Sequence, residues 1–273
     1  MPNEIYAAFG DGSANAVGSF YGLVLVPEHA VSTADDEIAA IKIEFGGARA
    51  SRIHCREIFH RIARSKSDWS HLGSGEIVEM CERICSVLDR RRSKCLLAYM
   101  PKDRFPARIR SPGGGGRPAL VHRLDEKWLT LWGFFQLGRL LDPVALIAPA
   151  RRAAEPGAGR PPFDGMLFRR RGPGPKVRIL HLDRESSRVR WLSESVPWAV
   201  AARRLAIETD RGVTHLPITP ESAARPMLLD VADLVTYSLA RAIAGTDPIP
   251  YRRGLGGLDA KLVIGSAEDI PVA

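Results

Sequence analysis

Four aspartates of this chain stand in stretches that are otherwise apolar. Asp11 follows the first apolar run, and Asp183 closes the strand-like segment RILHLD. Asp230 and Asp233 lie in PMLLDVADLVTYSLARAIAG, a segment that is apolar nearly all round and is therefore predicted to be a buried helix. Because residues three apart on a helix are neighbours, these two carboxylates share one face.

A carboxylate in an apolar setting is costly unless an arginine, backbone donors or a metal ion neutralises it. If strand-end and helix carboxylates meet at one point, they form an oxygen cage of the kind that suits Mg²⁺ or Mn²⁺. Two other interpretations stay open. Asp11 is also a residue type that turns favour, and a helix aspartate can form a buried ion pair with an arginine such as Arg225 or Arg241.

The elements that would position these acids begin with a predicted β-hairpin. Ile5–Phe9 and Phe20–Val26 are short runs of strand-forming residues, and the Gly/Ser/Asn-rich stretch Gly10–Gly18 joins them. The second run is apolar on both faces, which predicts a central strand.

Helices and strands alternate along the rest of the chain. The further predicted elements are a helix that begins at Ser32 or Thr33 and ends at Gly46-Gly47, a strand at Ser51–Cys55, a helix at Glu57–Ala63, a helix at about Glu76–Arg91, a strand at Lys94–Met100, a long helix carrying Leu120, Leu124, Trp128, Leu131 and Phe135, a strand at Val177–Leu182, a helix around Val196–Glu208, a strand near Val213–Leu216 and a helix from Pro226 to about Ala244. This alternation predicts one α/β domain over residues 1–273, with a mixed sheet flanked by helices on both faces.

Three segments are expected outside that core. SPGGGGRP (111–118) reads as a flexible connector, because it lacks the Gly-Lys-Ser/Thr ending of a phosphate-binding loop. Residues 149–176, rich in Pro, Gly and Arg, are predicted to be an exposed insertion. A short C-terminal tail is expected from about residue 246.

The charge balance indicates an anionic partner. The chain has a net charge of +8 and a pI near 9.6, mostly through arginine. Guanidinium groups bind phosphate backbones well, so nucleic acid, either DNA or RNA, is the expected partner. Arg169, Arg170 and Arg171 precede the strand that ends at Asp183 and would guide a nucleic-acid backbone toward the acids, unless they only solvate a surface loop.

The apolar runs, the N-terminal residues and the cysteine usage together predict a cytoplasmic protein. No apolar run has the length of a bilayer span, and the N-terminus lacks the basic-then-apolar pattern of a signal peptide. Four cysteines suit a reducing compartment with buried thiols. Cys81 and Cys85, with Cys55 and His54, would be candidate zinc ligands, but their place on an apolar helix face favours core packing.

Several short motifs, in order, resemble a known family. The stretch DGSA at 11–14, before the strand GSFYGLVLV, looks like the first hairpin of ribonuclease H-like proteins, and the wider pattern resembles the uncharacterised ribonuclease H-like family numbered 3800 among domains of unknown function. The matching pieces are VLVP leading into a helix, RIHCREIF with His54 and Glu57, RILHLD with Asp183, and LLDVADLV with Asp233 and with Asp230 in the place of a glutamine. They cover most of residues 4–245. The chain departs from the family's Asp-Glu-Ser-Gly opening at Gly12 and Ala14.

The resemblance implies a ribonuclease H-like mixed sheet and hydrolysis of phosphodiester bonds with two divalent ions, Mg²⁺ or Mn²⁺, about 4 Å apart. In that scheme Asp11 bridges both ions from the first strand. Asp233, and with it Asp230, holds one ion, while Glu57 and Asp183 complete the shell.

Two assignments within this scheme stay open. The strand beside the first often supplies a carboxylate in this fold, and if Lys94–Met100 is that strand, Asp103 competes with Asp183. His54 and, less so, His181 would assist proton transfer or contact phosphate, although either would also fit a purely structural role.

The sequence thus predicts a metal-dependent nuclease. A non-catalytic nucleic-acid-binding protein of the same fold is one alternative, and a metal-dependent phosphohydrolase of a small phosphorylated molecule is another. The choice between DNA and RNA, the strandedness of the substrate and the oligomeric state remain open at this point.

Overall fold

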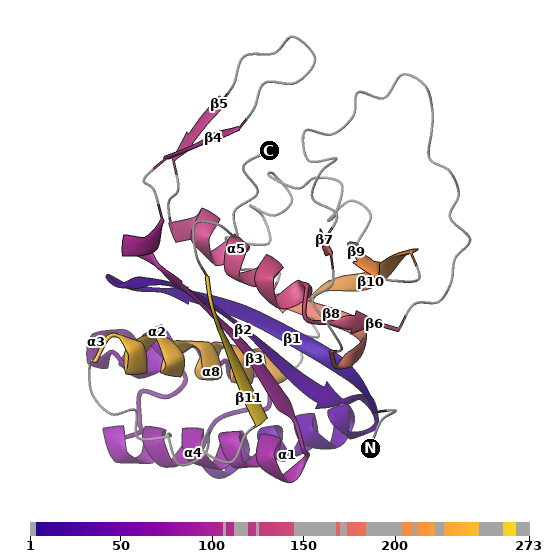
Figure 1. Ribbon diagram of the computed structural model, residues 1–273. Helices are drawn as coiled ribbons and strands as arrows, with labels where there is room; N and C mark the ends of the chain where they lie inside the picture. Colours follow the sequence, from indigo (N-terminus) through magenta and orange to yellow (C-terminus); the bar gives the residue numbers. More distant parts are fainter. Residues whose placement is uncertain are drawn as a thin grey trace.

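A mixed β-sheet runs through the middle of the molecule and carries helices on both faces (Figure 1). The computed structural model of the chain describes residues 4–105, 108–111, 120–123, 126–144, 168–169, 174–183, 204–209, 212–221, 227–245 and 259–265. Within them, no helix is long and apolar enough to cross a membrane.

Five strands form the centre of the sheet in the order β8-β1-β2-β3-β11. They are β1 (Ile5–Ala14), β2 (Gly18–Pro27), β3 (Lys94–Pro101), β8 (Lys176–Asp183) and β11 (Asp259–Ile264). β2 is antiparallel to both β1 and β3, whereas β8 is parallel to β1 and β11 is parallel to β3. The sheet is therefore mixed, as the sequence predicts.

The sheet continues beyond β8 through shorter pairings. The further strands are β10 (Gly212–Glu221), parallel to β8, then β9 (Arg204–Thr209), β7 (Phe168–Arg169) and, also on β8, β6 (Asp142–Pro143). β4 (Arg108–Ser111) and β5 (Leu120–Arg123) form a separate antiparallel ribbon.

The helices divide between the two faces of the sheet (Figure 1). They are α1 (Val31–Glu44), α2 (Cys55–Ile58), α3 (Arg61–Arg64), α4 (Ser74–Arg90), α5 (Glu126–Gly138) and α8 (Leu228–Ile243), with 3-10 turns η1 (Glu28–Ala30) and η2 (Lys102–Arg104). Residues of α1, α4 and α8 form one buried cluster with Ala7 and Phe9, and residues of α5 form the other with Tyr6 and Ala8. The alternation along β1 thus separates the two layers of the core.

The first hairpin is confirmed, but its strands are longer than predicted. The register runs from Tyr6 opposite Pro27 to Ala14 opposite Ser19. Asp11 therefore lies inside β1, opposite Gly22, and the turn interpretation of Asp11 is wrong. Pairing with β2 continues past Asp11 to Ala14, which fixes this position in a strand and overrides the weak preference of Asp against strands.

Several long, strongly patterned elements agree closely with the sequence. These are α1, α4, β3, β8 and α8, and the two glycines expected to end α1 and α8, Gly46 and Gly245, have positive φ values of 80° and 66°. All four cysteines are free and buried. Left-handed backbone directly after a helix is a common way for it to end, and glycine adopts it without strain.

Other predicted elements differ. Residues 51–54 form no strand, and the single helix predicted at Glu57–Ala63 is two short helices, α2 and α3. Residues 204–209 are a strand rather than a helix end, residues 120–123 are a strand that precedes α5, and residues 259–264 in the expected tail pair with β3. Residues 112–118 and 196–203, the rest of the connector and of the predicted helix, lie outside the described residues.

Candidate functional site

Asp11 lies where α8 packs against the sheet. The hydroxyl of Thr236 on α8 is 3.4 Å from the backbone oxygen of Asp11, to which it donates. A Cβ atom added to Gly22, the cross-strand partner of Asp11, would come within 2.2 Å of the same hydroxyl. Gly22 is thus required for the close approach of the helix, and Asp11 is held directly beneath α8, with its carboxylate accepting the N–H of Gly12 at 2.7 Å.

The parallel strands beside β1 end in further acids. The register pairs Phe9 with His181 and Gly10 with Leu182, so Asp183 follows at the level of Asp11. Glu221, the last residue of β10, pairs with Asp183. The backbone register therefore places three acidic positions, on the neighbouring strands β1, β8 and β10, at the same level near the ends of these strands.

Glu221 was not among the acids that sequence reasoning selected. The signal was available, because VTHLPITPE ends in an acid after an alternating run, much as RILHLD does. The strand was predicted too short, at Val213–Leu216, and so the acid at its end was overlooked.

The strand order also separates the two rivals for the third carboxylate. β3, which leads into Asp103, pairs with β2 and β11 and not with β1. Asp103 itself is exposed in η2. The neighbour of β1 is β8, so the topology favours Asp183 over Asp103.

Asp233 is buried, with 6% of its surface exposed, and it holds a histidine. Its Oδ2 atom accepts hydrogen bonds from Nδ1 of His54 at 2.9 Å and from the N–H of Cys55 at 2.8 Å. The hydrogen bond to Asp233 raises the pKa of the half-exposed His54, against the opposing effect of burial. The nearby charge of the exposed Glu57 raises the pKa of His54 further.

Asp230 is engaged in a buried ion pair. Its Oδ2 atom lies 2.5 Å from Nζ of Lys42 on α1, and both side chains are almost fully buried. The same oxygen accepts the N–H of Ile53 at 3.2 Å. These contacts favour the ion-pair interpretation of Asp230 over a role as metal ligand, although the partner is a lysine. Of the two arginines expected, Arg241 lies against Tyr237 and Arg225 is outside the described residues.

The two acids of α8 together fix the segment that carries His54. Asp230 accepts from Ile53 and Asp233 accepts from Cys55, so alternate N–H groups of residues 53–55 are bonded to one helix. This arrangement explains why the predicted strand at 51–55 does not form, because its backbone donors pair with carboxylates instead. It also places the imidazole of His54 beside Asp233.

Burial and several nearby groups act on the pKa of one buried thiol, that of Cys55. Burial is the main reason that the pKa of Cys55 is raised well above its usual range, and the charges of Asp233 and Asp11 add to it.

The donors at this place fit a hard divalent cation better than zinc. Carboxylate oxygens from Asp11 and Asp233 are ligands that Mg²⁺ and Mn²⁺ prefer. Burial raises the pKa of Cys81 and Cys85, which opposes the thiolate form that zinc requires. Among the side chains that the structure describes, however, no three His, Cys, Asp or Glu residues form a metal-binding group.

The remaining sequence candidates are His181 and the three arginines of residues 169–171. The ring of His181 stacks on that of Phe9, with centroids 4.7 Å apart. Arg169 belongs to β7, whereas Arg170 and Arg171 lie outside the described residues.

Comparison with known proteins adds no relative: no family model, curated protein or solved structure matches this chain.

Proposed function

We propose that this chain is a ribonuclease H-like protein that hydrolyses phosphodiester bonds of nucleic acid with the help of Mg²⁺ or Mn²⁺. The observation that carries the proposal is that Asp11 lies beneath α8, the helix that carries Asp233, on the strand beside the one that ends at Asp183. The antiparallel first hairpin and the mixed sheet with helices on both faces agree with the fold that the sequence resemblance implies.

In this proposal Asp11 and Asp233 hold the cations, with Asp183 and Glu221 as the further acids at the ends of the neighbouring strands. When bound, the cations supply the positive charge that activates a water and stabilises the leaving oxygen. Asp233 fixes the orientation of His54 through Nδ1, which leaves Nε2 as the ring atom able to exchange a proton with substrate or water. The net charge of +8 favours a polyanionic substrate.

The test is a cleavage panel over single- and double-stranded DNA and RNA with added Mg²⁺ or Mn²⁺. Asp11→Asn and Asp233→Asn should abolish cleavage and keep nucleic-acid binding. Asp36→Asn is the matched control, because Asp36 is an exposed aspartate of α1 whose carboxylate pairs with Arg49. Cleavage by Asp11→Asn at the wild-type rate would overturn the proposal.

One observation supports a second candidate, a nucleic-acid-binding protein without catalysis. Both acids of α8 already have cationic or hydrogen-bonding partners within the chain, Lys42 for Asp230 and His54 for Asp233. Salt-sensitive binding with no cleavage under any metal condition would favour this candidate. Turnover of a small phosphoester without polymer affinity would contradict both.

A further inference from the structure

Helices α2 and α8 are joined by two successive side-chain contacts. The first is polar, between His54 and Asp233, and the second is aromatic, between Phe59 and Tyr237. The two rings are stacked, with centroids 5.6 Å apart and planes 6° from parallel. Because Phe59 follows α2 directly and Tyr237 is one turn beyond Asp233, both contacts lie in one row along α8.

Arg241 continues this row by one more turn. Its guanidinium carbon is 5.7 Å from the centroid of the Tyr237 ring, and its Nη1 atom donates to the Tyr237 hydroxyl at 3.4 Å. Asp233, Tyr237 and Arg241 are four residues apart in turn, so they share a face of the helix. At 1.5 Å per residue, Arg241 lies roughly 12 Å along the axis from Asp233.

This row combines the groups by which proteins bind a nucleic-acid strand. Phe59, Tyr237 and Arg241 are all half-buried at the rim of the core, so each is partly open to solvent and partly held in place. A guanidinium packed on an aromatic ring loses less conformational freedom on binding than a fully mobile one, and its planar fork suits phosphate. Aromatic and cationic side chains side by side are the usual features of surfaces that bind single strands.

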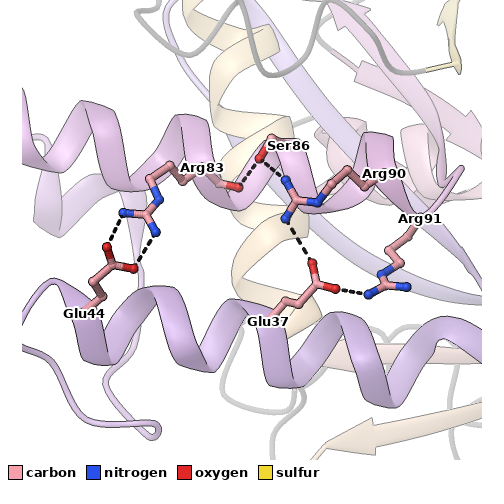
Figure 2. A network of polar contacts seen from close by, with 6 residues as sticks. All are labelled: Glu37, Glu44, Arg83, Ser86, Arg90 and Arg91. Atoms are coloured by element: carbon pink, nitrogen blue, oxygen red, sulfur yellow. Dashed lines mark hydrogen bonds and ion pairs between the residues drawn. The ribbon is translucent and has the colours of Figure 1, made fainter.

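Arg83 of α4 also packs on an aromatic ring, with its guanidinium carbon 5.4 Å from the centroid of the Phe45 ring, but it is not part of the row along α8 that includes Asp233. Arg83 donates to both carboxylate oxygens of Glu44, at 2.8 and 2.5 Å, and Arg90 bonds to Glu37 at 3.0 Å (Figure 2). Arg83 therefore provides a matched control for Arg241.

We propose that Arg241 binds a backbone phosphate of a nucleic-acid strand whose reacting phosphodiester lies at Asp233, and that the Phe59–Tyr237 stack holds Arg241 for this contact. The inference rests on the proposed function for the identity of the polymer. It adds the direction of the strand's path, along α8 from Asp233 toward the end of the helix.

The test measures binding separately from cleavage. Fluorescently labelled single-stranded and duplex oligonucleotides of DNA and RNA are titrated in EDTA at several salt concentrations with wild type, Arg241→Gln, Arg241→Lys and Arg83→Gln. Arg241→Gln should weaken binding on the order of tenfold and lower the slope of log K against log salt by about one phosphate contact, roughly 0.7 to 0.9. Arg241→Lys should keep the slope and lose part of the affinity, and Arg83→Gln should match wild type.

The outcomes separate this inference from the proposed function. If Arg241→Gln binds with unchanged affinity and slope while wild type cleaves in Mn²⁺, the inference alone fails. If Arg241→Gln weakens binding but no metal supports cleavage, the inference stands for a binding protein. An equal loss with Arg83→Gln would show a general charge effect and would overturn the inference, and circular dichroism establishes that each variant is folded.

Discussion

Two regions of this molecule use the same kinds of charged residue in opposite environments. Between α1 and α4, Glu44 pairs with Arg83, and Glu37 pairs with Arg90 and Arg91, while Ser86 accepts from Arg90 (Figure 2). These side chains are partly or largely exposed. Across the interior, Lys42 of the same helix α1 pairs with Asp230 of α8, and both are almost fully buried.

The difference shows that the number of ion pairs does not measure their importance. An exposed pair exchanges contacts with water at little net cost, so its contribution is typically below about 1 kcal/mol. A buried charge that loses its partner has no water to replace it, and the penalty is several times larger. The exposed pairs tie one helix to the next, whereas the buried pair sits beside the segment that presents His54.

The largest effect is expected from removing one partner of the buried pair. Lys42→Met leaves Asp230 buried without its cation, and we expect a loss of about 3–5 kcal/mol in the free energy of unfolding. Urea denaturation of the metal-free protein measures it. The loss follows from the burial of both side chains, which are 1% and 2% exposed.

The double variant Lys42→Met/Asp230→Leu is the control for that prediction. Replacing both charges by apolar groups of similar size removes the unpaired charge and should recover most of the stability. If the double variant loses as much as the sum of the two single variants, the side chains are not coupled and the contrast between the two regions fails.

A smaller effect on stability is expected from the His54–Asp233 contact. This contact is intermediate in burial between the buried Lys42–Asp230 pair and the exposed α1–α4 pairs, because His54 is 36% exposed. The pKa of His54 is raised in the fold by the hydrogen bond that its ring donates to Asp233. The folded state therefore binds the proton more tightly, so the contact stabilises the protein fully below the ordinary pKa of about 6.5 and is lost as the pH rises through the raised value.

The measurement is the free energy of unfolding between pH 5 and 9 in EDTA, for wild type and His54→Gln. From pH 5 to pH 9, the free energy of unfolding of wild type should fall further than that of His54→Gln. The difference should stay below about 1 kcal/mol, because solvent screens the pair. An increase in the stability of wild type relative to His54→Gln as the pH rises would contradict the sign. NMR titration of the His54 ring reports its pKa directly.

The sequence predicted the fold best where one pattern dominates over many residues. The apolar stripe of α4 and the buried run of β2 needed no tertiary information, and neither did the glycines that end α1 and α8. The segment around His54 could not be predicted in the same way, because its backbone donors pair with Asp230 and Asp233, far away in the sequence. Local preference has no access to such contacts.

The acids are predicted as a group, but the roles of the individual acids depend on partners that local sequence patterns do not reveal. Lys42 occupies the same stripe as Ile38, Ile41 and Phe45, at i, i+3, i+4 and i+7, so its burial was encoded in the pattern. Reading that position as a buried lysine would have suggested a partner for Asp230.

The smallest effect is expected in the surface network. Glu37→Gln removes the charge that faces both Arg90 and Arg91, yet all three side chains reach solvent, and the loss should stay below about 1 kcal/mol. The same urea denaturation measures it, and the difference from wild type should shrink further at 1 M salt, where charges are screened within about 3 Å. A loss as large as that of Lys42→Met would mean that the α1–α4 pairs are coupled as strongly as the buried one, and exposure would then no longer explain why the two regions differ.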